Sequence, residues 1–376
     1  LVKNSIHNNA NIVLTVFTIL NYLHFIKFTF GMNKYLNILS FFLFLVIGCS
    51  GDDNGGEEAP AQNKVTSLNI YISATETTVG QSLLFSVIDN TGVNRTKEAK
   101  FYVNDVEIPG SSYLFKEVGT FLVHAKFQGI LSSRKEIVVN PVPIEFKKRV
   151  LVEDYTGTWC GWCPRISYAI EKLEDETEDA VIVAAHQGDP MQFNKISSLM
   201  SNFNITGFPT GIINREVSWT YPQPDNVGQV TAKLSQKAYI GLAINSSLDG
   251  NNLSVNAKVK IGYNYAALKL GVYIVEDNLV YDQENYTSYY GGSSVLKDFK
   301  HHNVLRESLT NILGDQLPNE NVGHDKIFER NFTYSIPPAY NKSNIKIVAF
   351  VTPGSSKAVL NVRGAKIGDE QSIEQN

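Results

Sequence analysis

The sequence predicts a multidomain protein in which two all-β domains flank one α/β domain. Residues 64–142 alternate apolar and polar side chains in short runs between turn signals, which is typical of antiparallel strands. Residues 146–238 contain apolar, strand-like runs that alternate with helical periodicity, which indicates an α/β unit. Alternation with a period of two returns over residues 239–376 and predicts a C-terminal β-sandwich.

The amino-acid composition excludes several classes of function for this protein. The chain has 376 residues, of which 43% are hydrophobic, so it is long enough for two or three cores. A net charge of -4 gives no reason to expect nucleic acid as a partner. The cysteines are Cys49, Cys160 and Cys163, and this small number excludes both a four-cysteine zinc site and a fold stapled by several disulfides.

The N-terminus carries the features of an export signal. Met32 is followed by a short basic start and an apolar run from residue 38 to residue 47, so residues 32–48 are predicted to be a signal peptide. Residues 1–31 are interpreted as an upstream mis-extension. Residues 45–49, Leu-Val-Ile-Gly-Cys, resemble a bacterial lipobox, which implies that Cys49 is lipidated and becomes the mature N-terminus. The alternative is a transmembrane helix with an incidental cysteine.

Residues 49–63 are predicted to be the lipidated cysteine and a flexible acidic tether, since Gly, Asn, Pro and acidic residues cannot bury a core. The acidic cluster resembles the export tags of some surface lipoproteins, although an ordinary solvated linker fits it equally well. The strands of residues 64–142 then favour an immunoglobulin-like sandwich, because five short strands separated by turns occupy fewer than a hundred residues.

The main candidates for reactive residues are Cys160 and Cys163. An apolar run over residues 150–152 leads into Thr-Gly-Thr, the two cysteines follow, and Ile166, Ala169, Ile170 and Leu173 repeat at helical spacing. The pair is therefore predicted at the start of a helix, where free N–H groups favour a thiolate. Cys160 is the expected nucleophile, and Cys163 is placed to resolve a mixed disulfide.

The order of elements over residues 146–238 resembles the minimal thioredoxin fold. Residues 207–210, Gly-Phe-Pro-Thr, stand where that fold keeps a cis-proline, so Pro209 is expected beside the cysteines and the backbone of Phe208 is expected to pair with a substrate peptide. Asp154 precedes Cys160 by six positions, as the buried acid of thioredoxins does, and is the expected proton acceptor. A β-bulge would give that place to Glu153.

Tryptophans border the cysteines. Trp159 and Trp162 are candidate walls of a substrate groove, or one of them packs on the sheet. His186 is interpreted as a histidine whose hydrogen bonds are satisfied by a loop, and Trp219 is expected in surface or interface packing.

In residues 239–376 the predicted sandwich is interrupted by a Tyr- and Gly-rich loop over residues 281–292. Residues 300–306 form a polar segment, Lys-His-His-Asn-Val-Leu-Arg. No carboxylate cluster completes a metal site around its histidines, so no metal is expected. Arg306 is expected in a salt bridge rather than in an anion site.

Taken together, the chain resembles the outer-membrane lipoproteins with a thioredoxin-like core found in certain Gram-negative anaerobes. The resemblance rests on residues 153–164 (Glu-Asp-Tyr-Thr-Gly-Thr-Trp-Cys-Gly-Trp-Cys-Pro), 207–210 and 301–306, and it covers residue 146 to the C-terminus. It implies a place in the cell envelope as an outer-membrane lipoprotein, on the periplasmic face or the cell surface, and implies no particular reaction.

Two functions follow from these features. The first is a membrane-tethered thiol–disulfide oxidoreductase that acts on protein thiols or disulfides outside the cytoplasm. It needs no dissociable cofactor, and its partners are those protein substrates and the outer-membrane lipid around its anchor. The second is a non-enzymatic surface lipoprotein, a binding or adhesion module whose disulfide is structural. The residues between the thiols, Gly161 and Trp162, tune the redox potential, so the direction of electron transfer stays open.

Overall fold

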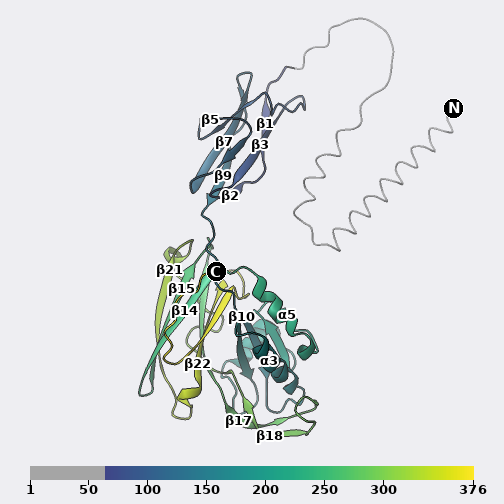
Figure 1. Ribbon diagram of the computed structural model, residues 1–376, viewed down its shortest axis with the longest axis vertical. Coiled ribbons are helices and arrows are strands. Elements are labelled where there is room, and N and C mark those ends of the chain that lie inside the picture. Colours follow the sequence, from purple (N-terminus) through teal and green to yellow (C-terminus); the bar gives the residue numbers. More distant parts are fainter. Residues whose placement is uncertain (1–63) are drawn as a thin grey trace, which may run out of the picture. The chain divides into compact units, whose positions relative to one another are not determined.

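The computed structural model describes residues 64–376 (Figure 1). The predicted mis-extension, signal peptide, Cys49 lipidation site and tether lie outside the described residues. The described chain is rich in strands, as predicted, and its few helices are confined to residues 164–235 apart from two 3₁₀ turns.

The N-terminal unit is a sandwich of two sheets, as predicted. One sheet has the order β1-β3-β6, and the other has the order β2-β9-β7-β4-β5 with β8 paired to β7. Their bounds are β1 (Leu68–Ile72), β2 (Glu76–Thr78), β3 (Ser82–Asp89), β4 (Lys100–Val103), β5 (Val106–Ile108), β6 (Ser112–Leu114), β7 (Gly119–Phe127), β8 (Ile130–Leu131) and β9 (Lys135–Asn140). Alternate side chains of both sheets, among them Phe85, Val87, Phe101, Val123 and Ile137, form a single buried core.

The α/β unit follows the predicted order of strand, helix, strand, helix, strand, strand and helix. Its elements are β10 (Val150–Thr156), α3 (Pro164–Glu176), β11 (Ala180–His186), α4 (Ile196–Phe203), β12 (Thr210–Ile213), β13 (Val217–Ser218), η1 (Gln223–Asp225), α5 (Val227–Thr231) and η2 (Ala232–Ser235). β10 lies between β11, which is parallel to it, and β12, which is antiparallel. Every residue of β10 is buried, since packed layers cover both of its faces.

The sheet of the α/β unit continues into the C-terminal region. The order β13-β12-β10-β11-β19-β16-β22-β23 joins the α/β strands to β16 (Leu268–Glu276), β19 (Val304–Ser308), β22 (Ile345–Pro353) and β23 (Asn361–Lys366). The junction is short, because β11 and β19 share the one register pair Ala184 and Val304. The Ala184 amide donates to the carbonyl of Asn303 at 2.7 Å. The predicted boundary at residue 239 divides the sequence, but one hydrogen-bonded sheet contains strands from both sides of it.

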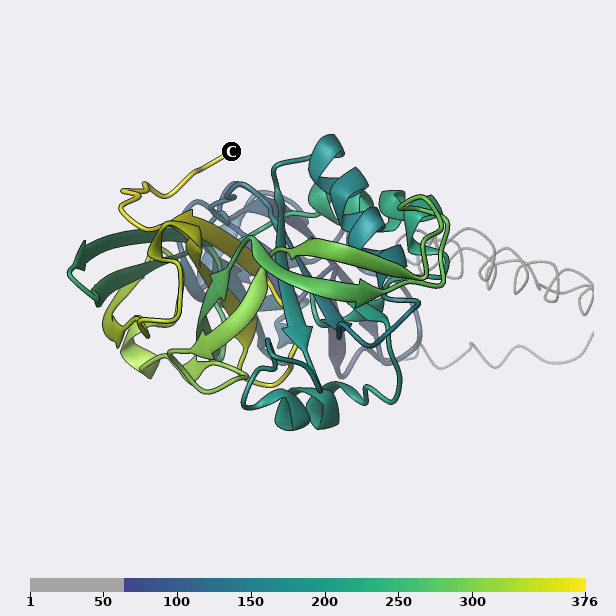
Figure 2. The same cartoon turned by 90° about the horizontal axis from the view of Figure 1, so that it is seen from below.

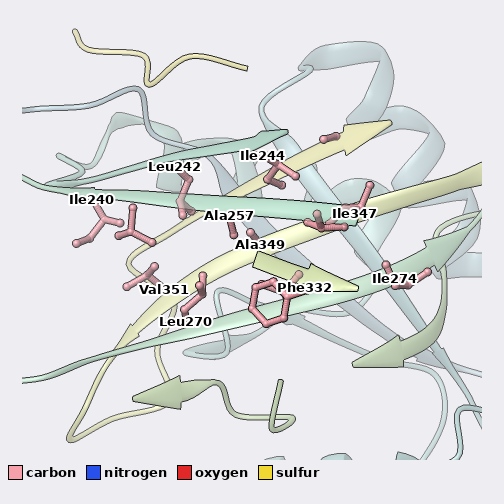
Figure 3. Packing of buried hydrophobic residues seen from close by; sticks show 14 of the residues in the cluster. Ile240, Leu242, Ile244, Ala257, Leu270, Ile274, Phe332, Ile347, Ala349 and Val351 are labelled. Carbon is pink, nitrogen blue, oxygen red and sulfur yellow. The ribbon is translucent and has the colours of Figure 1, made fainter. Parts of the chain in front are cut away.

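The predicted C-terminal sandwich is present and shares this sheet. Its second sheet consists of β14 (Ile240–Asp249), β15 (Asn252–Ile261) and β21 (Ile327–Ser335). Buried aliphatic side chains fill the space between this sheet and β16 and β22 (Figure 3). Ile244, Leu270 and Ile347 come from three different strands of that core. β20 (Asp315–Gln316) pairs with β16, and the 3₁₀ turns η3 (Asn319–Asn321) and η4 (Lys342–Asn344) lie in the connections.

Two expectations for this half of the chain were wrong. The stretch 281–292 is not a loop throughout, because β17 (Leu279–Glu284) runs through its first residues and pairs with β18 (Val295–His301). Trp219 is not a surface residue. It is 2% exposed, packs beside Val227 and Val230, and donates from Nε1 to the Asn226 carbonyl at 2.9 Å. Covering its one polar atom allows the whole indole to be buried.

A buried ion pair ties β10 to the C-terminal strands. Glu153 points to the sheet face opposite α3 and accepts hydrogen bonds from Arg215 Nε at 3.0 Å and Nη2 at 2.7 Å. Nη2 of Arg215 also bonds the hydroxyl of Tyr273 on β16 at 2.7 Å, and that hydroxyl donates to the Ile312 carbonyl. The guanidinium lies over the ring of Phe350 on β22, with its carbon 4.4 Å from the ring centroid. Each charge is thus compensated without solvent.

Replacing Arg215 by Met should destabilise the protein by about 3–5 kcal/mol, because it leaves the Glu153 carboxylate buried without a partner. Urea unfolding at pH 7 measures this. The control is Lys258→Met, which breaks a partly exposed pair with Glu329 and should cost less than about 1 kcal/mol. Equal losses in the two variants would contradict the account of the buried pair.

Candidate redox site

Cys160 and Cys163 form a disulfide at the start of α3. Cys163 is the N-cap residue of that helix, and Pro164 follows at its first position, where the missing N–H costs nothing. Turn hydrogen bonds of 3.0 Å run from the Cys160 amide to the Gly157 carbonyl and from the Cys163 amide to the Cys160 carbonyl. Both cysteines are nearly buried, with 5% of Cys160 and 1% of Cys163 exposed. The first cysteine is the one nearer to solvent.

Trp159 borders the disulfide on the side of the proline loop. Its indole Nε1 donates to the Gln187 carbonyl at 2.7 Å, and its ring meets the edge of Phe208 with centroids 5.5 Å apart. A Cβ on Gly157 would lie 2.7 Å from Trp159 Nε1, so this ring position requires glycine there. Trp159 nevertheless remains 47% exposed. The structure thus brings together two of the three predicted substrate-binding residues, Trp159 and Phe208.

Pro209 lies at the same end of the sheet. The Phe208–Pro209 bond is cis, as expected. Thr210, the next residue, is the register partner of Tyr155 near the carboxyl end of β10, where the chain turns into the loop that carries the cysteines. The pairing of β12 with β10 is therefore sufficient to place the loop that carries Pro209 next to the loop that carries the cysteines.

The other side of the disulfide loop is covered by the hairpin of β17 and β18, which sequence reasoning missed. The Glu284 amide donates to the Thr158 carbonyl at 2.8 Å, and the Tyr286 amide donates to the Gly161 carbonyl at 2.7 Å. Gln283 Nε2 bonds the Cys160 carbonyl at 3.0 Å. Figure 2 shows the hairpin crossing beside the helices of the α/β unit. The backbone of the cysteine loop is thus held by residues more than a hundred positions away.

Tyr286 also explains the glycine between the cysteines. A Cβ on Gly161 would lie 2.5 Å from the Tyr286 ring, so no larger residue fits beneath it without a shift. The same ring meets Trp162 edge to face at 5.8 Å, and Trp162 is 52% exposed. Tyr168 of α3 stacks on Tyr289 at 4.8 Å. The Tyr-rich composition of residues 281–292 was the sequence feature that could have indicated this contact. It does not show, however, which part of the chain these residues cover.

His186 organises the loop beneath Trp159. Its Nδ1 lies 2.7 Å from Asp189 Oδ2, which also accepts the Thr158 amide at 2.9 Å. Burial raises the pKa of the Asp189 carboxyl, but its hydrogen bonds to His186 and to backbone amides lower that pKa more, so the net shift is downward. The histidine is satisfied by its loop, as the sequence interpretation has it.

Asp154 and Glu153 point to opposite faces of β10. Asp154 shares the face of Val150 and Val152, which pack in one cluster with Ile166 of α3. It is 3% exposed, and its Oδ1 has no hydrogen-bond partner. Burial raises the pKa of the Asp154 carboxyl to about 8, against a smaller lowering effect of the Arg165 charge. The Asp154 carboxyl, on the face toward α3, is therefore mostly protonated at pH 7, whereas Glu153 on the opposite face is paired with Arg215.

The remaining candidates take no part in such a site. Arg306 pairs with Glu276, with Nε 3.2 Å from Oε2, as expected. In residues 64–376, no group of three or more His, Cys, Asp or Glu side chains is placed to hold a metal ion. None of the helices over the same residues is long and apolar enough to cross a membrane.

The raised pKa of Asp154 predicts a pH-dependent stability. An unfolded aspartate loses its proton near pH 4 and the folded one near pH 8, so the folded state holds more protons between these values and stability falls as pH rises. Asp154→Asn should abolish this fall and gain up to about 5 kcal/mol above pH 8. Urea unfolding over pH 5–9 is the measurement, and Asp249→Asn, at an exposed position, is the control. Because burial also lowers the pKa of His301 to about 4, which gives the opposite slope below about pH 6.5, the comparison is between wild type and Asp154→Asn: a difference in stability that does not change with pH would contradict the burial argument.

Comparison with known proteins agrees with this geometry. Residues 131–237 match the model of the family described as Thioredoxin, and residues 196–371 match that of the family described as Outer membrane protein Omp28. No curated protein matches the chain.

Three solved structures resemble parts of the chain. HBP35 of Porphyromonas gingivalis is 20% identical with a TM-score of 0.48, and the match covers 60% of this chain and 77% of that one. A structural-genomics protein from Agrobacterium tumefaciens is 14% identical with a TM-score of 0.39, over 60% of this chain and 97% of that one. A domain of the outer membrane lipoprotein Omp28 from Porphyromonas gingivalis is 20% identical with a TM-score of 0.25, over 36% and 92%. The chain thus joins residues that match the thioredoxin family to residues that match an outer-membrane family, which confirms the predicted resemblance and agrees with the predicted outer-membrane location.

Proposed function

We propose that the protein is a thiol–disulfide oxidoreductase, tethered to the outer membrane, that acts on protein thiols or disulfides outside the cytoplasm. The observation that carries the proposal is the Cys160–Cys163 disulfide at the N-terminus of α3, with the buried, protonated Asp154 on the sheet face toward that helix. A disulfide that only stabilises the fold needs no such acid.

The chemistry follows from these three groups. In the reduced protein the N–H groups at the start of α3 favour the Cys160 thiolate, which attacks one sulfur of a substrate disulfide and releases the other as a thiolate. Cys163 then attacks Cys160 in the mixed disulfide and frees the second substrate sulfur. Two electrons pass from the protein dithiol to the substrate, and the reverse sequence oxidises a substrate dithiol.

Asp154 handles the proton in this scheme. Cys163 must lose its thiol proton to attack, and a carboxylate is the base available beneath it. With a pKa of about 8, roughly a tenth of Asp154 is ionised at pH 7, and the proton that it accepts is easily returned. Glu153 is unsuited to this role because Arg215 holds it on the opposite face.

The exposed aromatic rings supply the substrate surface. Trp159 and Phe208 lie on one side of Cys160, and Trp162 lies on the other. We assign the backbone of Phe208, whose ring packs against Trp159, as the place where an extended substrate peptide binds by strand-like hydrogen bonds. The hairpin covers Gly161, which leaves the Trp159 side for the peptide.

The tether is the second part of the proposal. Cleavage of the signal peptide before Cys49 and lipidation of that cysteine anchor the protein in outer-membrane lipid through residues 49–63. The redox site then acts on proteins at that membrane.

The second candidate function is a binding or adhesion module with a structural disulfide. The observation that favours it is the burial of both cysteines under a hairpin whose backbone bonds Thr158 and Gly161. In that case the two sandwiches carry the function, and the Cys160–Cys163 bond only fixes the start of α3.

The two functions differ in the reactivity of the cysteines. Incubated with a peptide disulfide, the reduced protein should exchange rapidly, Cys160→Ser should not react, and Cys163→Ser should stop at a covalent mixed disulfide. Mass spectrometry of quenched samples measures all three. Since no cysteine follows Cys163, a form of the chain that begins after Cys49 contains no other thiol, and the double Ser variant serves as the blank.

Alkylation gives the second readout. Cys160 should react at pH values well below about 8.5, the pKa of a free cysteine thiol. A reduced protein that reacts only above that value and forms no mixed disulfide would contradict the oxidoreductase function and leave the binding function as the remaining candidate.

A further inference from the structure

A small cavity lies between β10, α3, β11 and the end of the hairpin, and Asp154 is one of the residues that line it. Its volume is about 50 Å³. The lining residues that matter are Asp154 on β10, His186 on β11 and His301 at the end of β18. His301 is the first histidine of the polar segment 300–306, to which the proposed function assigns no role.

Two polar atoms of the residues that line this cavity are buried without a hydrogen-bond partner. They are Oδ1 of Asp154 and Nε2 of His301. Their residues are 3% and 6% exposed. Buried polar atoms are almost always paired, and an unpaired one costs the free energy of its lost hydration. Two such atoms around one small cavity therefore point to a shared ligand rather than to two separate defects.

His301 is oriented as a hydrogen-bond acceptor. Its ring meets His186 edge to face at 5.3 Å and Phe299 at 5.1 Å, so it cannot turn freely. Burial, together with the neighbouring His186, lowers the pKa of His301 to about 4, so the imidazole is neutral at pH 7. A neutral ring has one N–H, and its hydrogen bond to the backbone of Tyr281 uses that donor. Nε2 then presents a lone pair.

The cavity is large enough to hold water. A buried water needs a cavity of at least about 10–15 Å³ and is held when it finds two or more polar partners. Water can donate one hydrogen to Asp154 Oδ1 and the other to His301 Nε2, which pairs both atoms at once. The side chains around it are not placed to hold a metal ion, since no group of three or more His, Cys, Asp or Glu in residues 64–376 is so placed.

We propose that His301 is a positioning residue of the redox site: its Nε2 holds a water against Asp154 Oδ1, and through this water Asp154 exchanges protons with the solvent. The proposal rests on the proposed function for its purpose, since a buried base must shed its proton between turnovers. Its structural content, the link between His301 and Asp154, does not depend on catalysis.

Other charged groups lie near Asp154 and His301 and influence the pKa values of both. Arg165 acts on Asp154, and Asp189 and His302 act on His301. The titratable side chains that line the cavity are Glu171 and Glu174 of α3, His186 of β11, and Lys300 and His302. All of these remain when His301 alone is replaced, so the change in Asp154 reports on His301.

The test compares His301→Phe with His301→Gln. Phe keeps a ring between His186 and Phe299 but offers no acceptor, so the water is lost and the Asp154 carboxylate loses its hydrogen-bond donor. The pKa of Asp154 should then rise by about one to two pH units. Gln keeps an acceptor and should leave that pKa within about half a unit of the wild-type value. Infrared titration of the carboxyl band, assigned by its absence in Asp154→Asn, measures this in the disulfide form of the protein.

A carboxyl band that titrates at the same pH, or at a lower one, in His301→Phe would overturn the proposal. If that variant does not fold, ¹⁵N spectra of the wild-type imidazole decide: a protonated Nε2 at pH 7 contradicts the acceptor role, and a bare Nε2 supports it. Because the disulfide form does not turn over, these outcomes are independent of whether the protein catalyses exchange. A result against the oxidoreductase function would not contradict the water link between His301 and Asp154. A result against the water link would not contradict the oxidoreductase function.

Discussion

The hydrogen bond between the Ala184 amide and the Asn303 carbonyl marks the constraint on which the site depends. At this point β11 and β19 share their one register pair, and the sheet of the thioredoxin-like domain passes into the C-terminal region. β19 also pairs with β16, so this one bridge connects the α/β strands to the C-terminal sheet. The chain just before β19 ends the hairpin at His301, beside the cavity above Asp154, and the hairpin tip reaches the cysteine loop at Gly161. Residues of the region that matches the Omp28 family thus border the candidate redox site.

Two acids in the middle of β10 show how the fold deals with buried charge. Glu153 is paired with Arg215, which also contacts the Tyr273 hydroxyl and so ties the pair to β16. Asp154 has no cation in contact, so burial shifts its equilibrium toward the neutral acid. Glu153 thus stabilises the packing of β10 against the C-terminal strands, whereas Asp154 holds a proton on the face of β10 toward α3. Strand alternation separates the two roles, since adjacent residues point to opposite faces.

Features that depend on local sequence were predictable. The cysteine pair at the start of α3, the strand before it, the cis bond at Pro209 and the choice of Asp154 for the helix-facing side follow from short-range spacing and from the resemblance to thioredoxins. The longer strands of both sandwiches followed from alternation, whereas the short strands β2, β5, β6 and β8 and the C-terminal strands β17 to β20 and β23 did not. The expectation for Trp219 was wrong because a Pro-rich neighbourhood indicates a surface loop, whereas a single satisfied Nε1 permits burial.

What escaped prediction is non-local. Nothing near Tyr286 indicates that its amide bonds Gly161, and nothing near His301 indicates that it borders a cavity with Asp154. Both depend on a strand pairing between residues more than a hundred positions apart, and hydrophobic alternation carries no information about which strands become partners. The shared sheet was hidden for the same reason, because each half of the sequence predicts a complete unit by itself.

The reduction potential of the Cys160–Cys163 pair, measured by equilibration with glutathione, tests most directly whether this assembly is a working redox centre. A potential between roughly −270 and −120 mV, the range of thioredoxin-like catalysts, is the result that the account predicts. Within that range the value also sets the direction, with the low end favouring reduction of substrates and the high end favouring oxidation. A potential below about −300 mV would place the pair among structural disulfides and contradict the account.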